Sequence, residues 1–394
     1  MPLVYVPAAI VGFAELPNRL KTGRSAYDLA GEVFDALLAR TGFDPADIDG
    51  LAVVGTMSEA PNPFYPAYLA ESLGVSPAWL ESLHLGGVSC VGGVARALAA
   101  IHAGLCRAVV LIAVDAQATR NPSEQGAYRP EFLYPVGLRG PVGAFGLLSQ
   151  RYHHQYGLDA TALAKLAVVQ RQHALLNPLA CSKLRSPITE ADYLASRYVS
   201  EPLRLLDSVM VCDGGSALLI VADDVARGMA VSRSVRVRAY AERTHHNLRD
   251  PLADITESGF TVVGPQVLQQ AGLTPQQIHM FHPYDDFLIA IQMQLEQIGF
   301  CQPGQGARFI HDTDLSYRGT LPLNTGGGQI SAGQPGLAGG GVNLTEAVRQ
   351  LLGEGEARQV AQAANALVTG IGVIPYGRNW STSAAMVLEA GEPA

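Results

Sequence analysis

Residues Leu83–Asp115 read LHLGGVSCVGGVARALAAIHAGLCRAVVLIAVD, and this stretch decides the fold. It predicts the end of a strand, a turn of small residues, a helix from Val91 to His102 and a buried strand from Ala108 to Val114. Glycine, serine and cysteine at the junction of strand and helix let a substrate approach the backbone closely, and a helix N-terminus offers N–H groups to a developing negative charge. The turn is therefore a candidate reaction centre.

The same unit occurs twice along the chain. Three pairs of segments match in the same order: Thr41–Val54 with Ala271–Tyr284, Gly92–Asp115 with Gly340–Gly372, and Gly214–Asp224 with Ser381–Gly391. The first pair shares a glycine at a helix end, an Asp-Pro or Thr-Pro start and a strand. A duplication of alternating strands and helices predicts two similar α/β halves that pack together.

The predicted halves are residues 1–230 and 231–394. The first should contain a strand at Leu3–Phe13, a helix at Ser25–Arg40 capped by Ser25, a strand at Gly50–Val54 and a helix at Pro66–Leu73. The second should contain a strand at Val235–Tyr240 and helices at Val262–Gln270 and Leu288–Ile298.

A long insertion, a loop domain at about residues 116–206, separates the strand ending at Asp115 from one starting near Ala217. It is far longer than the roughly 2 to 6 residues of a common connection. Such an excursion can carry substrate contacts, or it can cap the core and build an oligomer interface, and both interpretations stay open.

Composition restricts the functions open to this chain. Its 394 residues are 48% hydrophobic, enough for one large core or two joined ones. A net charge of −8 argues against nucleic acid as a partner, because phosphate binding needs clustered Lys and Arg. The five cysteines show no metal-ligand spacing, and an odd count suits a reducing cytoplasm. From the cysteines we expect no metal site and a cytoplasmic location. We also expect no membrane span, since no apolar run approaches about 20 residues.

A second glycine-rich segment lies in the later half. Asn324–Gly341, NTGGGQISAGQPGLAGGG, contains eight glycines, which suggests backbone lying against a ligand. It resembles the Asn-x-x-Gly-Gly-x-x-x-x-Gly-His-Pro loop of the thiolase superfamily. YDDFLIAIQMQLEQIGFC (284–301) and SEPLRLLDSVMVCDGGSALLIVAD (200–223) are also similar to that superfamily, in particular to its sterol-carrier-protein and lipid-transfer-type branch. The resemblance covers essentially the whole chain and implies a thiolase fold with a five-layer αβαβα core.

The catalytic motifs of a thiolase are replaced in this chain. Counting back from Gly104 puts the nucleophilic cysteine's position on Gly87, and Cys90 follows one helical turn later. Gln334 stands for the histidine of Gly-His-Pro, Tyr284 for the Asn or His of the third motif, and Gly370 for the second cysteine. Neither glycine nor glutamine can form a thioester or deprotonate a thiol, so covalent acyl transfer is expected to be lost.

What the resemblance then implies is an acyl-CoA aldolase. Thiolase-like proteins that lack the cysteine and carry tyrosine resemble the aldolases of steroid side-chain degradation, which cleave a β-hydroxyacyl-CoA into a ketone and a shorter acyl-CoA. This retro-aldol step needs a base, donors for the enolate oxygen and an acid, but no nucleophile. Tyr284 is retained, whereas Gln334 stands where those aldolases have a second tyrosine, so the acyl group is left open.

Individual residues receive these roles. Tyr284 is expected to shuttle a proton or donate to the oxyanion, although it could be a core tyrosine tied to the adjacent Asp pair. Gln334 is expected to orient the thioester carbonyl. The substrate-binding or oxyanion candidates are Gly87, Ser89, Gly370 and His246. Cys90 is either a small buried residue or, because a thiol at a helix start can be reactive, a nucleophile.

Two other functions stay open beside the carbon–carbon lyase. A Claisen-type acyl-CoA thiolase or acyltransferase would use Cys90, and a non-catalytic thiolase-like subunit would leave the chemistry to another chain. The resemblance implies no cofactor beyond the coenzyme A of the substrate. It also implies a homodimer and a possible partner with an OB-fold domain of the DUF35 type, which together would form a heterotetramer.

Overall fold

The computed structural model describes residues 6–60, 62–120, 130–138, 140–229, 231–247, 254–373 and 380–391. In it, the connection that is repeated in the sequence has the same structure in both halves. Helices α1 (Ala26–Thr41) and α9 (Phe260–Ala271) both end at a left-handed glycine, Gly42 and Gly272, each with φ 64°. A short 3₁₀ turn that begins at a proline follows each of them. The chain then enters strand β2 (Gly50–Val54) or β9 (Phe281–His282).

The strands of each half lie side by side in equivalent orders. The first half runs β3 (Trp79–Leu83), β2, β4 (Ala108–Asp115), β7 (Gly214–Ala222), β1 (Ala8–Glu15), and the second runs β9, β10 (Asn365–Ile371), β11 (Thr382–Gly391), β8 (Ser234–Thr244). In both halves the parallel pair, β2 with β4 or β9 with β10, is followed by an antiparallel one. The halves join where Ile10 of β1 pairs with Val235 of β8. The predicted duplication is confirmed.

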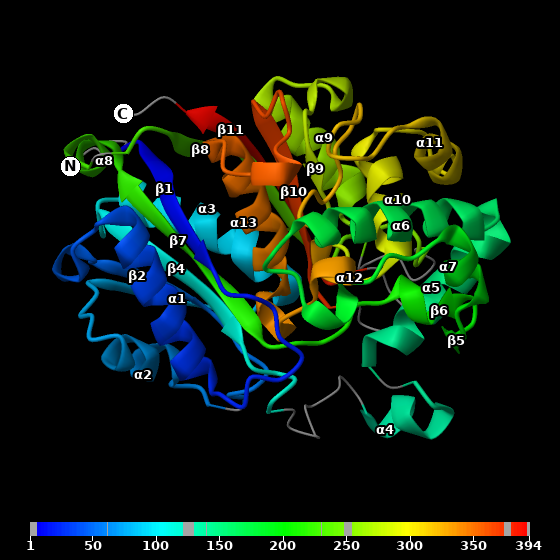
Figure 1. The fold of residues 1–394 in the computed structure, drawn as a ribbon, viewed down its shortest axis with the longest axis horizontal. Coiled ribbons are helices and arrows are strands. Elements are labelled where there is room, and N and C mark those ends of the chain that lie inside the picture. Colours follow the sequence, from blue (N-terminus) through cyan, green and yellow to red (C-terminus); the bar gives the residue numbers. More distant parts are fainter. Residues whose placement is uncertain are drawn as a thin grey trace.

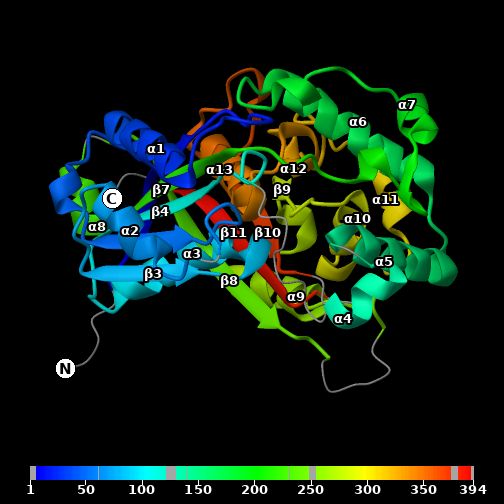
Figure 2. The same cartoon turned by 90° about the horizontal axis from the view of Figure 1, so that it is seen from below.

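Five layers alternate from one side of the molecule to the other (Figures 1 and 2). α1 and α2 (Tyr65–Ser72) share an apolar core with one face of the first-half strands. α3 (Ser89–His102) and α13 (Gly339–Leu352) pack together between the two groups of strands. α9 and α10 (Leu288–Ile298) cover the far face of the second half. This is the expected αβαβα core.

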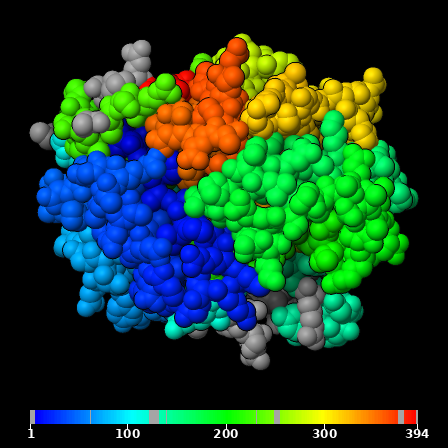
Figure 3. All heavy atoms as spheres, in the orientation of Figure 1, coloured from blue at the N-terminus to red at the C-terminus, as the bar shows by residue number. Residues whose placement is uncertain are grey.

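The insertion between β4 and β7 belongs to the first half in sequence but packs on the second. Its elements are α4 (Pro130–Leu133), α5 (Gly140–Tyr156), α6 (Ala160–Leu176), α7 (Glu190–Ala195), β5 (Tyr198–Ser200) and β6 (Leu203–Arg204). Phe145 of α5 stacks on Phe287, which precedes α10, with ring centroids 4.1 Å apart. In the space-filling view this green segment lies directly against the orange and yellow second half (Figure 3). The insertion therefore approaches the loop that contains Tyr284.

Most predicted elements lie within a few residues of the observed ones. α3 starts at Ser89 rather than Val91, and β1 spans Ala8–Glu15 rather than Leu3–Phe13, of which residues 3–5 lie outside the described residues. The remaining helices are α8 (Asp223–Gly228), α11 (Gly306–Asp312) and α12 (Gly328–Ala332). The boundary at residue 230 and the limits of the loop domain stay predictions. In the described part of the chain, no helix combines the length and apolarity needed to span a membrane.

Candidate functional site

The turn before α3 is held by hydrogen bonds of Ser89. Gly86 has φ 58°, a left-handed conformation that glycine adopts without strain, and it starts a 3₁₀ turn. Ser89 Oγ accepts a hydrogen bond from the N–H of Leu85 at 2.9 Å, and the Ser89 N–H donates to the Gly86 carbonyl. Ser89 thus holds the turn, while its predicted oxyanion role stays a prediction.

The ring of Tyr284 occupies the space beside Gly87. A Cβ atom built on Gly87 would lie 2.1 Å from Cε2 and 2.2 Å from Cζ of Tyr284, and 2.6 Å from the carbonyl oxygen of Ile371. Contacts that short are impossible for a real side chain, so position 87 accepts only glycine while Tyr284 is in place. The position assigned to the thiolase nucleophile is therefore filled by a phenol from the other half of the molecule.

Tyr284 is fixed by its backbone as well as by its ring. Its N–H donates to Thr369 Oγ1 at 2.8 Å, and its carbonyl accepts from Gln294 Nε2 at 2.8 Å. The hydroxyl of Thr369 in turn donates to Gln294 Oε1 at 2.5 Å. Strand β10 and helix α10 thereby clamp Tyr284 from both sides, which pre-organises the phenol for chemistry.

Gln334 is placed by the end of the insertion. Its N–H donates to the Met210 carbonyl at 3.0 Å, and its carbonyl accepts from the Cys212 N–H at 2.9 Å. The side-chain Nε2 donates to Gln329 Oε1 at 3.1 Å and makes a long contact with the Tyr284 hydroxyl at 3.5 Å. The glycine-rich loop thus brings an amide to the phenol. The role of Gln334 in orienting the thioester carbonyl stays a prediction.

The Asp pair after Tyr284 has two different environments. Asp285 is fully buried and accepts hydrogen bonds from the N–H of Gln329 at 3.0 Å, from the N–H of Ile330 at 3.3 Å and from Asn343 Nδ2 at 2.9 Å. Asp286 Oδ1 is sealed from solvent without a hydrogen-bond partner among the described residues. Burial raises the pKa of Asp285 to about 6, and burial together with the charge of Asp285 raises the pKa of Asp286 to about 8.

The protonation states of the other candidates follow from their burial. Burial, with the charge of Asp286, raises the pKa of Tyr284 well above its usual value, so the phenol is neutral at pH 7 and has a proton to give. Burial also raises the pKa of the Cys90 thiol to about 12. A Cβ on Gly340 would lie 3.6 Å from Cys90 Sγ, so α13 covers the thiol. These two facts argue against Cys90 as a nucleophile.

The structure brings together most of the predicted site residues. Gly370 of β10 lies against the turn, since a Cβ there would be 2.8 Å from the Gly87 carbonyl oxygen. His246 instead bonds to the carboxylate of Glu257 at 3.0 Å and to the hydroxyl of Thr261 at 3.3 Å. Its role in substrate binding stays a prediction.

Sequence reasoning missed three side chains of the site: Thr369 and Gln294, which bond to the backbone of Tyr284, and Gln329, which bonds to Gln334. It considered the Asp pair only as a possible partner of the Tyr284 hydroxyl. The three missed residues carried no local signal, because only the fold brings them to the site.

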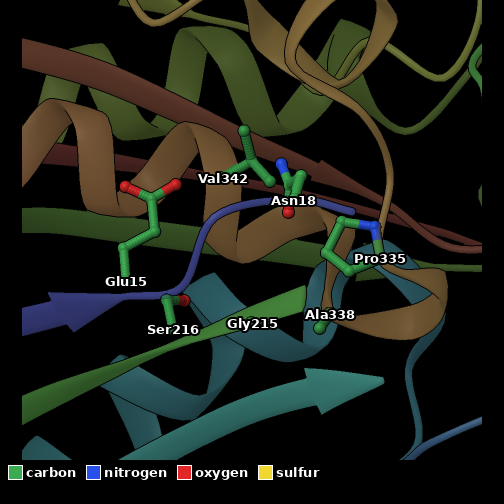
Figure 4. Close-up of a pocket in the computed structure, with 7 residues that line it drawn as sticks. All are labelled: Glu15, Asn18, Gly215, Ser216, Pro335, Ala338 and Val342. Atoms are coloured by element: carbon green, nitrogen blue, oxygen red, sulfur yellow. The ribbon is translucent and has the colours of Figure 1, made fainter. Parts of the chain in front are cut away.

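Behind the Gln334 loop the packing leaves a narrow gap (Figure 4). Pro335, Ala338 and Val342 face Glu15 and Asn18 across it. The gap is too narrow to hold a water molecule, so it is a packing feature rather than a substrate site.

Comparison with known proteins places this geometry in a family. Residues 241–390 match the family described as "Thiolase C-terminal domain-like". The steroid side-chain-cleaving aldolase of Thermomonospora curvata is 33% identical over 93% of this chain and 95% of its own length. The chain belongs to the aldolase branch of the thiolase superfamily.

Two further comparisons agree. The 17-hydroxy-3-oxo-4-pregnene-20-carboxyl-CoA lyase of Mycobacterium tuberculosis is 32% identical to this chain, over 93% of the chain and 97% of the lyase. The solved structure of an "Ltp2-ChsH2(DUF35) aldolase" superimposes with a TM-score of 0.85 at 30% identity, covering 99% of each chain.

The expected family, fold and reaction class are therefore confirmed. The protein is an acyl-CoA aldolase, a carbon–carbon lyase that splits a β-hydroxyacyl-CoA into a carbonyl compound and a shorter acyl-CoA. The geometry is compatible with this reaction: the Tyr284 phenol fills the space beside Gly87, the position assigned to the thiolase nucleophile from the sequence. The catalytic roles of these residues stay predictions.

Proposed function

We propose that this aldolase removes the side chain of a steroid as an acyl-CoA. Two relatives that align over 93% of the chain carry names that specify steroid substrates. In the substrate named for the mycobacterial relative, the hydroxyl on carbon 17 is β to the thioester attached at carbon 20. Cleavage between these carbons gives a 17-ketosteroid and propanoyl-CoA.

The observation that carries the mechanism is the phenol of Tyr284 against Gly87. A neutral phenol can donate its proton to the enolate carbon that forms when the carbon–carbon bond breaks. The Gln334 amide, 3.5 Å from that hydroxyl, is suited to orient the thioester carbonyl. The turn at Gly87 lies at the N-terminus of α3, whose partial positive charge favours a developing enolate oxygen.

Tyr284→Phe tests this assignment with a matched control. The variant keeps the ring that fills the space at Gly87 and loses only the hydroxyl, so kcat should fall by about 10²- to 10⁴-fold with little change in stability. Tyr65→Phe makes the same change at another buried tyrosine, whose hydroxyl has no partner among the described residues, and should leave kcat unchanged.

The substrate is tested by incubating the protein with 17-hydroxy-3-oxo-4-pregnene-20-carboxyl-CoA and measuring the 17-ketosteroid and propanoyl-CoA by mass spectrometry. A short-chain 3-hydroxyacyl-CoA is the comparison. Cleavage of the steroid ester with at least tenfold higher kcat/KM is expected. Preference for the short-chain ester would contradict the steroid assignment and leave the aldolase reaction intact.

We further propose that two copies pair and each binds a DUF35-type protein. β3 lies at the end of the strand order, so one edge of it is open in the described structure, and Leu80 on it is 41% exposed. An exposed, partly apolar edge is suited to pair with a second copy. The name of the superimposed aldolase includes a DUF35 component, which supports a partner of this type.

Light scattering with size-exclusion chromatography, on the chain alone and with DUF35-type proteins encoded near it, tests the assembly. A dimer alone and a species of two plus two chains with the partner are expected. A monomer whose mass does not change on mixing would contradict both proposals.

A further inference from the structure

The aldolase reaction needs a base that the residues described so far do not supply. Tyr284 is a neutral phenol and therefore an acid in the cleavage direction, and the Gln334 amide has no basic group at neutral pH. Cys90 is a covered thiol whose pKa burial raises to about 12. Yet the proton of the β-hydroxyl has to leave before the carbon–carbon bond can break.

Two carboxylates follow Tyr284, and their hydrogen bonds separate them. Asp285 accepts from Gln329, Ile330, Asn343 and Gln170, so both of its oxygens are occupied in holding the glycine-rich loop. Asp286 has an oxygen, Oδ1, that is buried and accepts no hydrogen bond from the described residues. A buried polar atom without a partner costs folding free energy, and such atoms are rare. Its presence therefore suggests a function.

The backbone around Asp286 is held by the segment that precedes β7. The Asp286 carbonyl accepts from the Val209 N–H at 3.2 Å, and the neighbouring residues Ser208 and Phe287 form an isolated bridge. The same insertion segment continues through Met210 to the backbone contacts of Gln334. One stretch of chain thus fixes the backbone of both Asp286, two residues after Tyr284, and Gln334, which contacts the Tyr284 hydroxyl. Phe145 stacks on Phe287 next to this segment.

The electrostatics agree with this position. After burial, the charge of Asp286 contributes most to raising the pKa of Tyr284, ahead of Cys90 and Asp285. The neutral imidazole of His282 is another base in principle, but the charges that act on it come from Glu346 and His173. Asp286 is the carboxylate with both a free oxygen and an influence on the phenol.

We propose that Asp286 is a catalytic residue that takes the proton of the substrate's β-hydroxyl, with Tyr284 as the acid that protonates the enolate carbon. This rests on the role of Tyr284 proposed above. The hydroxyl proton moves to Asp286 as its oxygen forms the ketone. The electron pair of the broken carbon–carbon bond enters the thioester as an enolate, which takes the Tyr284 proton. Asp286 then returns its proton to the phenolate, and both groups regain their starting charge.

The same pair working in reverse supplies a readout that needs no steroid. When a saturated acyl-CoA is bound, Asp286 draws the proton from Tyr284 while the phenolic oxygen removes one from the α-carbon. In D₂O the α-hydrogens of propanoyl-CoA should therefore exchange with solvent deuterium in the presence of the enzyme. Mass spectrometry measures that exchange whether or not a steroid-CoA is the natural substrate.

Asp286→Asn tests the proposal in the full chain, together with any partner that purifies with it. The kcat for 17-hydroxy-3-oxo-4-pregnene-20-carboxyl-CoA and the rate of α-exchange should both fall at least 100-fold, with KM changed less than threefold. The kcat of the parent should rise with pH as its base loses a proton, and the variant should lack this rise. Asp207→Asn, at a buried carboxylate that bonds to the Tyr193 hydroxyl in the insertion, is the control and should keep both activities.

The outcomes separate the two proposals. If the parent exchanges α-hydrogens but does not cleave the steroid ester, the steroid substrate is wrong and Asp286 is judged by the exchange alone. If Asp286→Asn retains more than a third of the parent's exchange, or the folded parent shows none, Asp286 is not the base. Circular dichroism must show both variants folded, and an unfolded Asp286→Asn is replaced by Asp286→Ser under the same criteria.

Discussion

At the scale of single residues, positions 87 and 284 compete for one volume. Gly87 has no side chain, and the Tyr284 ring fills the volume that a side chain there would need. The two positions are therefore coupled, because a larger residue at 87 and the phenol at 284 exclude each other. The packing thus links glycine at 87 to the tyrosine that we propose as the acid.

Gly87→Cys should abolish aldolase activity without creating a thiolase. The new side chain would clash with the Tyr284 ring, so we expect at least a 100-fold loss of kcat and a lower melting temperature. Gly31→Cys, where a Cβ would meet nothing within 4 Å, should keep activity. A folded Gly87→Cys protein that forms a stable acyl adduct in intact-mass spectrometry would contradict the coupling. Adding Tyr284→Ala should relieve only the clash with the ring, because the carbonyl oxygen of Ile371 stays 2.6 Å from the added Cβ.

A second prediction at this scale concerns His282. Burial lowers its pKa to about 4, against about 6.5 for an unfolded chain, and neither ring nitrogen has a partner among the described residues. The stability that depends on the neutral ring is complete above pH 6.5 and is lost as pH falls towards 4. His282→Phe removes this loss, so its free energy of unfolding relative to the parent should increase by about 1 kcal/mol per pH unit below pH 6. Urea unfolding at pH 7.5, 6 and 5 measures it, and a constant difference would contradict it.

At the scale of elements, the duplicated connection after α1 and α9 shows how local chemistry sets the path of the chain. Each helix stops at a left-handed glycine that no β-carbon-bearing residue adopts cheaply. A proline then starts a 3₁₀ turn, and the strand follows. These signals are local, which is why the sequence revealed them in both halves.

Gly42→Ala and Gly272→Ala should each lower the free energy of unfolding by about 1 kcal/mol, since the added Cβ strains the left-handed backbone and meets little else. Gly31→Ala, inside α1, should instead raise it by about 0.5 to 1 kcal/mol. Guanidinium unfolding of the three variants checks the opposite signs, and a gain at either helix end would disprove the role of the cap.

At the scale of the whole molecule, a buried charge network ties the halves together. Glu346 of α13 bonds to Arg358 at 2.9 Å and to Arg349 at 3.1 Å, and Arg349 pairs with Glu15 of β1. Burial alone would raise the pKa of Glu346, but the charges of Arg358 and Arg349 lower it to about 2. The network crosses from the first strand of one half to the central helix of the other.

Glu346→Gln should lower the free energy of unfolding by about 3 to 5 kcal/mol, because it removes the negative charge that neutralises the buried guanidinium groups of Arg349 and Arg358. Arg308→Ala breaks an exposed pair with Asp312 and should cost less than about 1 kcal/mol. Urea unfolding at pH 7 compares the two, and equal effects would show that burial of the network does not matter.

The sequence by itself determined the duplicated α/β architecture, the thiolase likeness and the absence of a nucleophile at Gly87. These follow from hydrophobic spacing, from glycine and proline at turns and from motif residues, all of which are local in the chain. Tertiary structure alone decided that Tyr284 fills the space at Gly87, that Thr369 and Gln294 clamp it and that Cys90 is sealed. It also separated Asp285 from Asp286, because hydrogen-bond satisfaction and burial depend on residues tens to hundreds of positions away that only folding brings into contact.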